Sequence, residues 1–370
     1  MEYDRPLFYH VMEYAAASER DTVDMVSGNP DWGPPDALRE GLIEYASGDP
    51  GQFQYPPSEG LSPLREEIAD RRGVEKERVI VTNGAGEANH LSMATGLEHH
   101  SGSEVLLADP VYPYYAGRSQ LLGATPTFVP AERTGQLDPD RVREAASEET
   151  ALIVVNTPNN PTGAVYDPDV MTDLIAIGEA NDALVVSDEV YDHFDYTGTF
   201  ESALSIDSEH RVVTNSFSKS LGVTGLRVGY AVLPERLVEA VRTRHMLTNV
   251  AGSRPAQRAV YQALRDTDRS YYERNRERLR DRIETFTEAL DAIGAEYARP
   301  DGGFYVLARF DSVPGTLENT KRLIDEAGVA GMPGEAFGRT RADWFRFALL
   351  TQRVDDAATR LEAFVSDKQL

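Results

Sequence analysis

Short apolar runs that alternate with longer helical patterns constrain the fold of this chain more than any other feature. The alternation extends from about residue 61 to residue 235. The runs are Val79-Ile80-Val81, Val105-Leu106-Leu107, Ala151-Leu152-Ile153-Val154-Val155, Leu184-Val185-Val186, Val212-Val213 and Gly229-Tyr230-Ala231-Val232-Leu233. Such runs are typical of strands buried on both faces, in a mostly parallel sheet that helices cover on either side. The sequence therefore predicts an α/β fold.

Polar residues follow these runs, and open α/β sheets bind ligands beyond the carboxyl ends of their strands. The polar followers are Asn83-Gly84, Asp109-Pro110, Asn156, Asp188-Glu189, and Ser216 with Lys219. We therefore expect a binding site at this edge of the sheet. The C-terminal third has charged helical patterns and a few short apolar runs, which indicates an α+β part. We expect a large domain over residues 45–255 and a small domain made of residues 1–44 and 256–370.

The segment Ser216-Phe217-Ser218-Lys219, with Arg227 eight residues after the lysine, indicates a reactive amine beside an anion site. Lysine can form an imine with an aldehyde, and the serines and arginine can bind phosphate oxygens. The chain has only four lysines against 33 arginines, and only Lys219 lies among small and hydroxyl residues. The segment predicts a site for an aldehyde that carries a phosphate.

The turn Gly84-Ala85-Gly86 after an apolar run has two interpretations. Backbone N–H groups of Ala85 and Gly86, at the start of a helix, can bind a phosphate. A dinucleotide fold is the alternative, with Asp109 near the place of a ribose-binding acid. The third glycine of the dinucleotide-binding motif is missing, because position 89 is occupied by Asn89. The turn alone leaves both interpretations open.

Four further residues could bind a ligand, and three of them have a structural interpretation as well. Asp188 could pair with a pyridine nitrogen, although a lone acid after a strand is more often a helix cap or a surface group. Tyr191, three residues on, could reach the same ligand. Asn160 could donate to a ring oxygen, although Asn-Pro-Thr-Gly forms a turn in any case. Tyr112 could stack on a ring or pack in the core.

These features occur in one order: a phosphate nest, a stacking ring, an amide, an acid with a tyrosine, a lysine and an arginine. Over nearly its whole length the chain resembles the class I and II aminotransferases, fold type I enzymes that use pyridoxal 5′-phosphate. The matching motifs are Gly28-Asn29-Pro30-Asp31, Tyr55-Pro56-Pro57-Ser58-Glu59-Gly60-Leu61, Asn83-Gly84-Ala85, Asp109-Pro110-Val111-Tyr112-Pro113, Asn159-Asn160-Pro161-Thr162-Gly163, Asp188-Glu189-Val190-Tyr191, Ser216-Phe217-Ser218-Lys219, Gly225-Leu226-Arg227-Val228-Gly229, Gly302-Gly303-Phe304-Tyr305, Pro333-Gly334-Glu335-Ala336-Phe337-Gly338 and Arg346. Gly86 departs from the pattern, because many relatives have glutamine there.

The resemblance implies a role for each site residue. The implied catalytic residues are Lys219, which holds the cofactor as an aldimine and then moves the α-proton, with Asp188 and Tyr191. The implied cofactor-binding residues are Ala85, Gly86, Tyr112, Asn160, Asp188, Tyr191, Ser216, Ser218, Lys219, Arg227 and, in the neighbouring subunit's site, Tyr55. Gly28, Asn160 and Arg346 are implied to bind the substrate, with Arg346 on its α-carboxylate. No metal is implied.

The implied reaction moves an amino group from an amino acid to a 2-oxo acid (EC 2.6.1.-) in a homodimer with shared active sites. A lyase or cyclising eliminase on the same cofactor is the alternative, because residues around the ring do not separate these reactions. A nicotinamide-dependent oxidoreductase would leave Lys219 and Arg227 unexplained. Arg254 could recognise an acidic substrate side chain in the partner's pocket, or could be a surface arginine.

The charge of −24 is spread along the chain and disfavours binding to nucleic acid or anionic membranes. Abundant acid with few lysines suggests adaptation to high salt, so we expect a halophilic archaeal source. The alternative is an ordinary acidic bacterial enzyme. No basic-then-apolar N-terminal pattern or membrane-length apolar stretch is present, which favours a cytoplasmic protein. Without cysteine the chain has no disulfide and no thiolate nucleophile or metal ligand.

Overall fold

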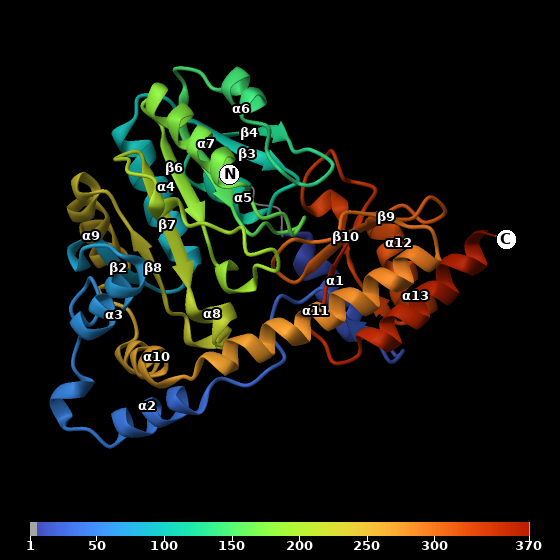
Figure 1. The fold of residues 1–370 in the computed structure, drawn as a ribbon, viewed down its shortest axis with the longest axis horizontal. Helices are drawn as coiled ribbons and strands as arrows, with labels where there is room; N and C mark the ends of the chain where they lie inside the picture. The colour runs from blue at the N-terminus through green and yellow to red at the C-terminus, as the bar shows by residue number, and fades with distance from the viewer. Residues whose placement is uncertain (1–5, 370) are drawn as a thin grey trace.

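The structure, a computed structural model, describes residues 6–369 (Figure 1). A seven-stranded sheet with the order β2-β8-β7-β6-β5-β3-β4 forms its centre. The strands are β2 (Val79–Thr82), β3 (Glu104–Asp109), β4 (Thr125–Pro130), β5 (Thr150–Asn156), β6 (Leu184–Asp188), β7 (Arg211–Ser216) and β8 (Gly229–Val232). Only β8 runs antiparallel to its neighbours. The predicted α/β fold with a mostly parallel sheet is confirmed.

Each predicted apolar run coincides with a strand of this sheet. The sheet also contains the edge strand β4, which the pattern of apolar runs did not predict. Its sequence, Thr125–Pro130, has only one buried residue, Val129. Because an edge strand has one neighbour and is partly open to solvent, it does not need a continuous apolar run. The pattern that predicts central strands therefore could not predict β4.

Helices cover both faces of the sheet, because successive strand residues point to opposite sides. Ile153 and Val155 of β5 belong to one hydrophobic core, and Leu152 and Val154 belong to another on the opposite face. The first core also includes residues of α2 (Asp36–Ala46), α3 (Ser62–Arg72), α6 (Pro139–Ala145), α7 (Pro168–Ala180) and α10 (Arg254–Asp266). The second includes residues of α4 (Ala85–His99), α5 (Tyr114–Leu121) and α9 (Glu235–Asn249).

A smaller body contains the C-terminal elements and the N-terminal segment. Its antiparallel sheet has the order β12 (Met332–Pro333), β13 (Phe345–Ala348), β10 (Tyr305–Arg309) and β9 (Glu296–Tyr297). A parallel pair joins β1 (Val23–Asp24) to β11 (Val329–Ala330). The helices are α1 (Leu7–Ala17), α11 (Arg269–Ala292), α12 (Leu317–Arg322) and α13 (Val354–Gln369). Phe286, Phe347 and Leu361 pack together in its core.

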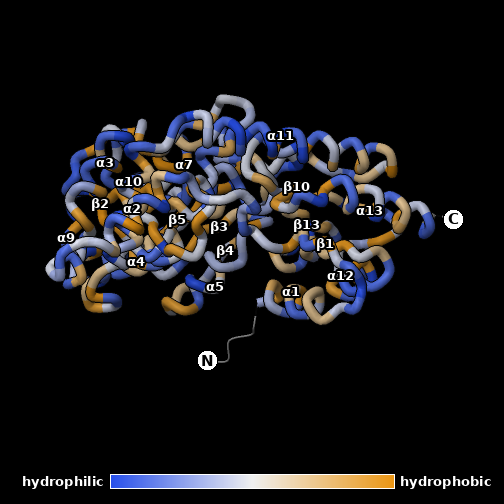
Figure 2. The backbone as a smooth tube through the Cα atoms, turned by 90° about the horizontal axis from the view of Figure 1, so that it is seen from below, coloured by the Kyte–Doolittle hydropathy of each residue, from blue (hydrophilic) through white to orange (hydrophobic). Residues whose placement is uncertain are grey.

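The long helix α11 connects the two bodies, because it starts beside α10 and ends beside α13 (Figure 1). Hydrophobic segments gather along strands such as β2, β3 and β5, whereas α11 is largely hydrophilic (Figure 2). Of the helices within residues 6–369, none combines the length and the apolar character that crossing a membrane requires.

Candidate active site

A cavity of about 610 Å³ opens at the carboxyl ends of the central strands. Its walls come from both bodies: strand ends and helix starts around the large sheet, and residues of α1, β10 and β13 from the smaller body. The sequence-predicted site residues that line it are Gly28, Ala85, Gly86, Tyr112, Asn160, Asp188, Tyr191, Ser216, Ser218, Lys219, Arg227 and Arg346. The structure therefore brings twelve of the thirteen predicted site residues into one cavity, and Tyr55 is the exception.

Lys219 lies on the short helix α8 (Phe217–Ser220), which directly follows β7 and places the side chain at the end of the sheet. Its Nζ donates a 2.5 Å hydrogen bond to the carbonyl oxygen of Gly28. Burial, with the charges of Arg346 and Arg227, lowers the pKa of Lys219 to about 8. The amine is therefore partly neutral near neutral pH, as a nucleophile or a base must be.

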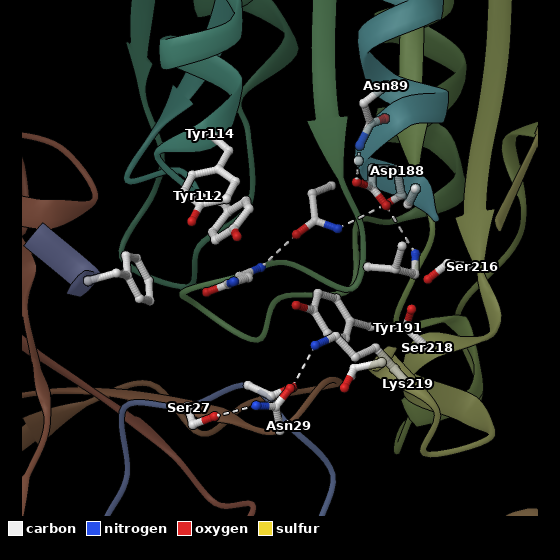
Figure 3. A pocket seen from close by; sticks show the side chains of 18 of the residues that line it. Ser27, Asn29, Asn89, Tyr112, Tyr114, Asp188, Tyr191, Ser216, Ser218 and Lys219 are labelled. Atoms are coloured by element: carbon white, nitrogen blue, oxygen red, sulfur yellow. Dashed lines mark hydrogen bonds between the residues drawn. The ribbon is translucent and has the colours of Figure 1, made fainter. Parts of the chain in front are cut away.

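Asp188 is the last residue of β6, and its carboxylate is held from three sides (Figure 3). Oδ2 accepts 2.6 Å hydrogen bonds from Asn89 and from the hydroxyl of Tyr115, and Oδ1 accepts a 3.2 Å bond from the Val190 amide. Thr214 donates to the Asn89 side-chain oxygen at 2.6 Å, which fixes the orientation of that amide. Burial raises the pKa of Asp188, and the hydrogen bonds oppose this shift.

A cradle for an anion lies where β2 gives way to α4. Gly84 precedes the helix with φ of 78°, and a Cβ added there would clash with the guanidinium of Arg227. Arg227 has φ of 53°, a strained conformation for a residue with a side chain. Its Nη1 lies 3.4 Å from the Ser218 hydroxyl, and its Nη2 donates to the Asn83 carbonyl. Hydroxyls, a guanidinium and the helix start thus converge as a phosphate requires.

Arg346 approaches from β13 of the smaller body and is 1% exposed. Its Nη1 donates to Asn160 Oδ1 at 3.2 Å and its Nη2 to the Val26 carbonyl at 2.5 Å. The ring of Tyr305 lies 4.3 Å from the guanidinium carbon. The Nε of Arg346 has no hydrogen-bond partner among the described residues. A buried guanidinium with an unsatisfied N–H and a cavity in front of it is suited to a carboxylate.

Aromatic rings complete the walls. Tyr112 lies with its ring centre 4.7 Å from that of Tyr114 and 6.1 Å from that of Phe8. The Tyr191 hydroxyl lies 3.3 Å from the hydroxyl of Tyr305. Burial raises the pKa of Tyr191 well above its usual value, so its hydroxyl stays protonated and can donate.

These groups fit pyridoxal 5′-phosphate. The cradle around Gly84, which a Cβ would fill, matches the phosphate, and Lys219 matches the aldehyde. The buried carboxylate of Asp188, which has donors on Oδ2 and only a long bond on Oδ1, matches a protonated ring nitrogen. Tyr191 and Asn160 can reach a ring oxygen from the same cavity.

Two predicted residues lie elsewhere. Tyr55 is 83% exposed and does not line this cavity. Arg254 donates from Nη1 to the carbonyl oxygens of Gly51 and Gln54, also outside the cavity. Neither residue therefore contributes to the cavity of its own subunit, and the surface interpretation of Arg254 remains.

Sequence reasoning missed Asn89, Tyr115, Arg118 and Tyr305, which line the cavity as well. In the sequence, Asn89 stands where a dinucleotide motif needs glycine. Its spacing held a usable signal, because Asn89 follows Ala85 by four residues on α4 and so lies on the same helix face.

Comparisons with known proteins agree with this geometry. The family model "Aminotransferase class I and II" matches residues 20–361. A probable aspartate/prephenate aminotransferase of Thermus aquaticus is 34% identical over 339 residues, which cover 88% of this chain and 87% of the relative. The aspartate aminotransferase of Thermotoga maritima is 30% identical over 359 residues, with 94% and 92% covered.

The solved structure of Thermus thermophilus aspartate aminotransferase with maleate has a TM-score of 0.91 and 31% identity, and the match covers 98% of this chain and 97% of that one. The dinucleotide interpretation of Gly84-Ala85-Gly86 is therefore wrong. In this structure Asp109, its proposed ribose-binding acid, accepts hydrogen bonds from the backbone amides of Arg339 and Thr340 instead. The chain is a pyridoxal-phosphate-dependent aminotransferase, and it belongs to the class I and II aminotransferase family.

Proposed function

We propose that this cavity moves an amino group between an amino acid and a 2-oxo acid, with aspartate or a related compound as a substrate. One observation carries the proposal: the Lys219 amine, the Asp188 carboxylate and the Arg346 guanidinium, which come from α8, β6 and β13, line one cavity. The names of the relatives in Thermus and Thermotoga support aspartate or prephenate as substrates.

Bound pyridoxal phosphate supplies an aldehyde for amine exchange and a protonated ring that withdraws electrons from the substrate α-carbon. Residues proposed to bind its phosphate are Ser216, Ser218 and Arg227, with the amides of Ala85 and Gly86. Asp188 keeps the ring nitrogen protonated, Asn160 and Tyr191 donate to the ring oxygen, and Tyr112 stacks on the ring face.

Lys219 is the residue that would move the α-proton of the substrate. Its amine, whose pKa is lowered to about 8, would act as the base that takes the proton from the substrate α-carbon and would hold that proton for return on the same face. Arg346 grips the α-carboxylate with two parallel hydrogen bonds, and the backbone of Gly28 lies beside the lysine and the carboxylate site. The two contacts orient the α-hydrogen toward Nζ.

A single-turnover experiment tests the proposal against a lyase of the same fold. The loaded enzyme is mixed with amino donor alone, and the products are separated by chromatography. Transamination gives one equivalent of pyridoxamine phosphate and one of 2-oxo acid, with no ammonia. Release of 2-oxo acid together with ammonia over many turnovers would mark a lyase. Lys219→Ala is expected to lose both the reaction and the absorbance band of the lysine-bound cofactor.

A homodimer with shared active sites is part of the proposal. Large apolar side chains are exposed around the segment that carries Tyr55, and others on the end of α9. They are Ile43, Phe53, Tyr55, Met246, Leu247 and Val250. A second copy would cover this surface, and the Tyr55 hydroxyl would then bind the phosphate in the partner's cavity.

The charge of −24 and the scarcity of lysine support a cytoplasmic enzyme of a halophilic archaeon that does not bind nucleic acid. Unfolding midpoints measured from 0.1 M to 3 M KCl test the salt adaptation, and a midpoint that does not rise with salt would count against it. Screening of the repulsion between carboxylates is the physical reason for the expected rise.

The division into residues 45–255 and residues 1–44 with 256–370 stays a proposal. Leu38 of α2 and Val260 of α10 share the hydrophobic core of the large sheet. This packing supports boundaries shifted to before α2 and after α10. Limited proteolysis followed by mass spectrometry would find which connections are cleaved first.

A further inference from the structure

Arg118 lines the active-site cavity, and the roles proposed above leave it unused. The other two guanidinium groups of the cavity are anchored: Arg227 by Thr224 and Asn83, and Arg346 by Asn160 and Val26. By contrast, the Arg118 side chain takes part in none of the hydrogen bonds or ion pairs found between residues 6–369. A cation inside a cavity without such a partner points to an anionic ligand.

Gly86 makes the position of Arg118 possible. A Cβ added to Gly86 would lie 3.3 Å from Arg118 Nη2, closer than ordinary contact, so the guanidinium lies against the first turn of α4. The N-terminus of a helix carries partial positive charge, which makes this a poor place for an unpaired cation. The cavity lining contains four basic side chains and one acidic one, Asp188, in a chain whose net charge is −24. This local excess of positive charge is relieved when an anion enters.

Arg118 approaches the cavity from a different element than the serines and Arg227 that are proposed to hold the phosphate, although its guanidinium also lies against Gly86. The serines and Arg227 belong to β7, α8 and the turn before β8, whereas Arg118 and Tyr114 extend from α5. Tyr9 and Met12 of α1 line the same cavity. None of these α1 and α5 residues has a proposed role toward the cofactor, and they line a part of the cavity where the side chain of a substrate could lie.

We infer that Arg118 binds the second carboxylate of a dicarboxylic amino acid or 2-oxo acid whose α-carboxylate is held by Arg346. This inference rests on the proposed function. It attributes the selection of dicarboxylic substrates to the Arg118 side chain. The planar fork of arginine donates two hydrogen bonds to a carboxylate, and the partly buried position strengthens these bonds relative to bonds in water. A substrate with an uncharged side chain would leave Arg118 without a partner, so it would be selected against.

The test compares dicarboxylic with monocarboxylic substrates in Arg118→Met, which keeps side-chain length but removes the charge. We expect kcat/KM for aspartate and glutamate to fall roughly 10- to 100-fold, and kcat/KM for alanine and phenylalanine to stay within about threefold. Arg118→Lys should recover part of the loss. Arg141→Met, on the exposed helix α6, is the matched control and should behave as the wild type.

Two binding measurements complete the test without turnover. The affinity of the loaded enzyme for maleate, followed by the absorbance of the lysine-bound cofactor, should fall about as much as kcat/KM for aspartate. The affinity of the cofactor-free chain for pyridoxal phosphate should stay within about threefold. A large loss of cofactor affinity with an unchanged substrate ratio would assign Arg118 to the phosphate and overturn the inference.

Equal losses for both substrate classes would also overturn it, as would a loss of dicarboxylate preference in Arg254→Ala but not in Arg118→Met. Failure of the proposed function is a distinct result. In that case no amino donor yields pyridoxamine phosphate in the wild type, while the maleate measurement still reports whether Arg118 binds a second carboxylate.

Discussion

Asn89 donates a 2.6 Å hydrogen bond to the carboxylate of Asp188, across 99 positions of the sequence. Tyr115 donates to the same oxygen at 2.6 Å. Both bonds favour the ionised carboxylate and oppose the effect of burial, which raises its pKa. The pair therefore keeps Asp188 charged opposite the position proposed for the ring nitrogen.

Removing the Asn89 amide should make Asp188 harder to ionise. In Asn89→Ala we expect the acidic limb of the kcat profile to move to higher pH, because the carboxylate that must be ionised has a raised pKa. At pH 7 kcat should fall about tenfold, as expected for the loss of one charge-assisted hydrogen bond. Tyr115→Phe is the companion variant with the same direction of shift. An acidic limb that stays in place in both variants would show that these bonds only position the carboxylate.

Exchanging Arg346 for lysine should separate substrate binding from cofactor binding. A lysine cannot form the two parallel hydrogen bonds to a carboxylate, so kcat/KM for every amino acid should fall roughly 100-fold in Arg346→Lys. The absorbance of the lysine-bound cofactor should remain, because the phosphate and ring contacts are untouched. An equal loss of cofactor affinity would mean that Arg346 shapes the cavity instead of gripping the substrate.

The Lys219 amine should destabilise the cofactor-free protein below pH 8. Its pKa falls from 10.5 to about 8 on folding, so below pH 8 the folded chain carries a charge that burial disfavours. Lys219→Met should then raise the free energy of unfolding by up to about 3 kcal/mol at pH 7.

The same difference should shrink as pH rises from 8 to 10.5. In that range the folded protein has lost a proton that the unfolded chain still holds, so rising pH stabilises the wild type relative to Lys219→Met. Urea unfolding of both proteins from pH 6.5 to 10 measures the difference. A difference that does not depend on pH would show that packing, and not charge, accounts for it.

Shared active sites predict complementation between two inactive variants. If Tyr55 serves the partner's cavity, a hybrid of a Tyr55→Ala subunit and a Lys219→Ala subunit contains one complete site. Mixing the two variants while unfolded and refolding them together should then restore up to about a quarter of wild-type activity, since half of the random pairs are hybrids with one intact site. Separately refolded variants are the control. A mixture no more active than these controls would place Tyr55 outside the catalytic site.

The sequence was sufficient to predict the central strands and most of the proposed site residues that line the cavity. Residues such as Asp188 and Lys219 directly follow apolar runs, and the geometry of a parallel sheet brings the ends of such runs together. Asn89, Tyr115 and Arg118 lie within helices, where a polar residue has an equally good interpretation as a surface group. Their functional surroundings depend on how α4 and α5 pack against the sheet, and local patterns do not contain that information. The space that the Arg118 guanidinium occupies exists because Gly86 has no side chain. The importance of this glycine becomes visible only when the positions of α4 and α5 are known.

Helix α4 carries both the amide of Ala85, at the phosphate cradle, and the side chain of Asn89, which holds Asp188. The two residues are one turn apart, so the rise of the helix, about 6 Å over four residues, sets the spacing between the two recognition points. A vitamer without phosphate would satisfy only the Asp188 end, and a longer phosphorylated molecule would not place its ring nitrogen there. If Ala85 and Asp188 have the proposed roles, one rigid turn of helix would make the enzyme selective among the forms of vitamin B6 before any substrate arrives.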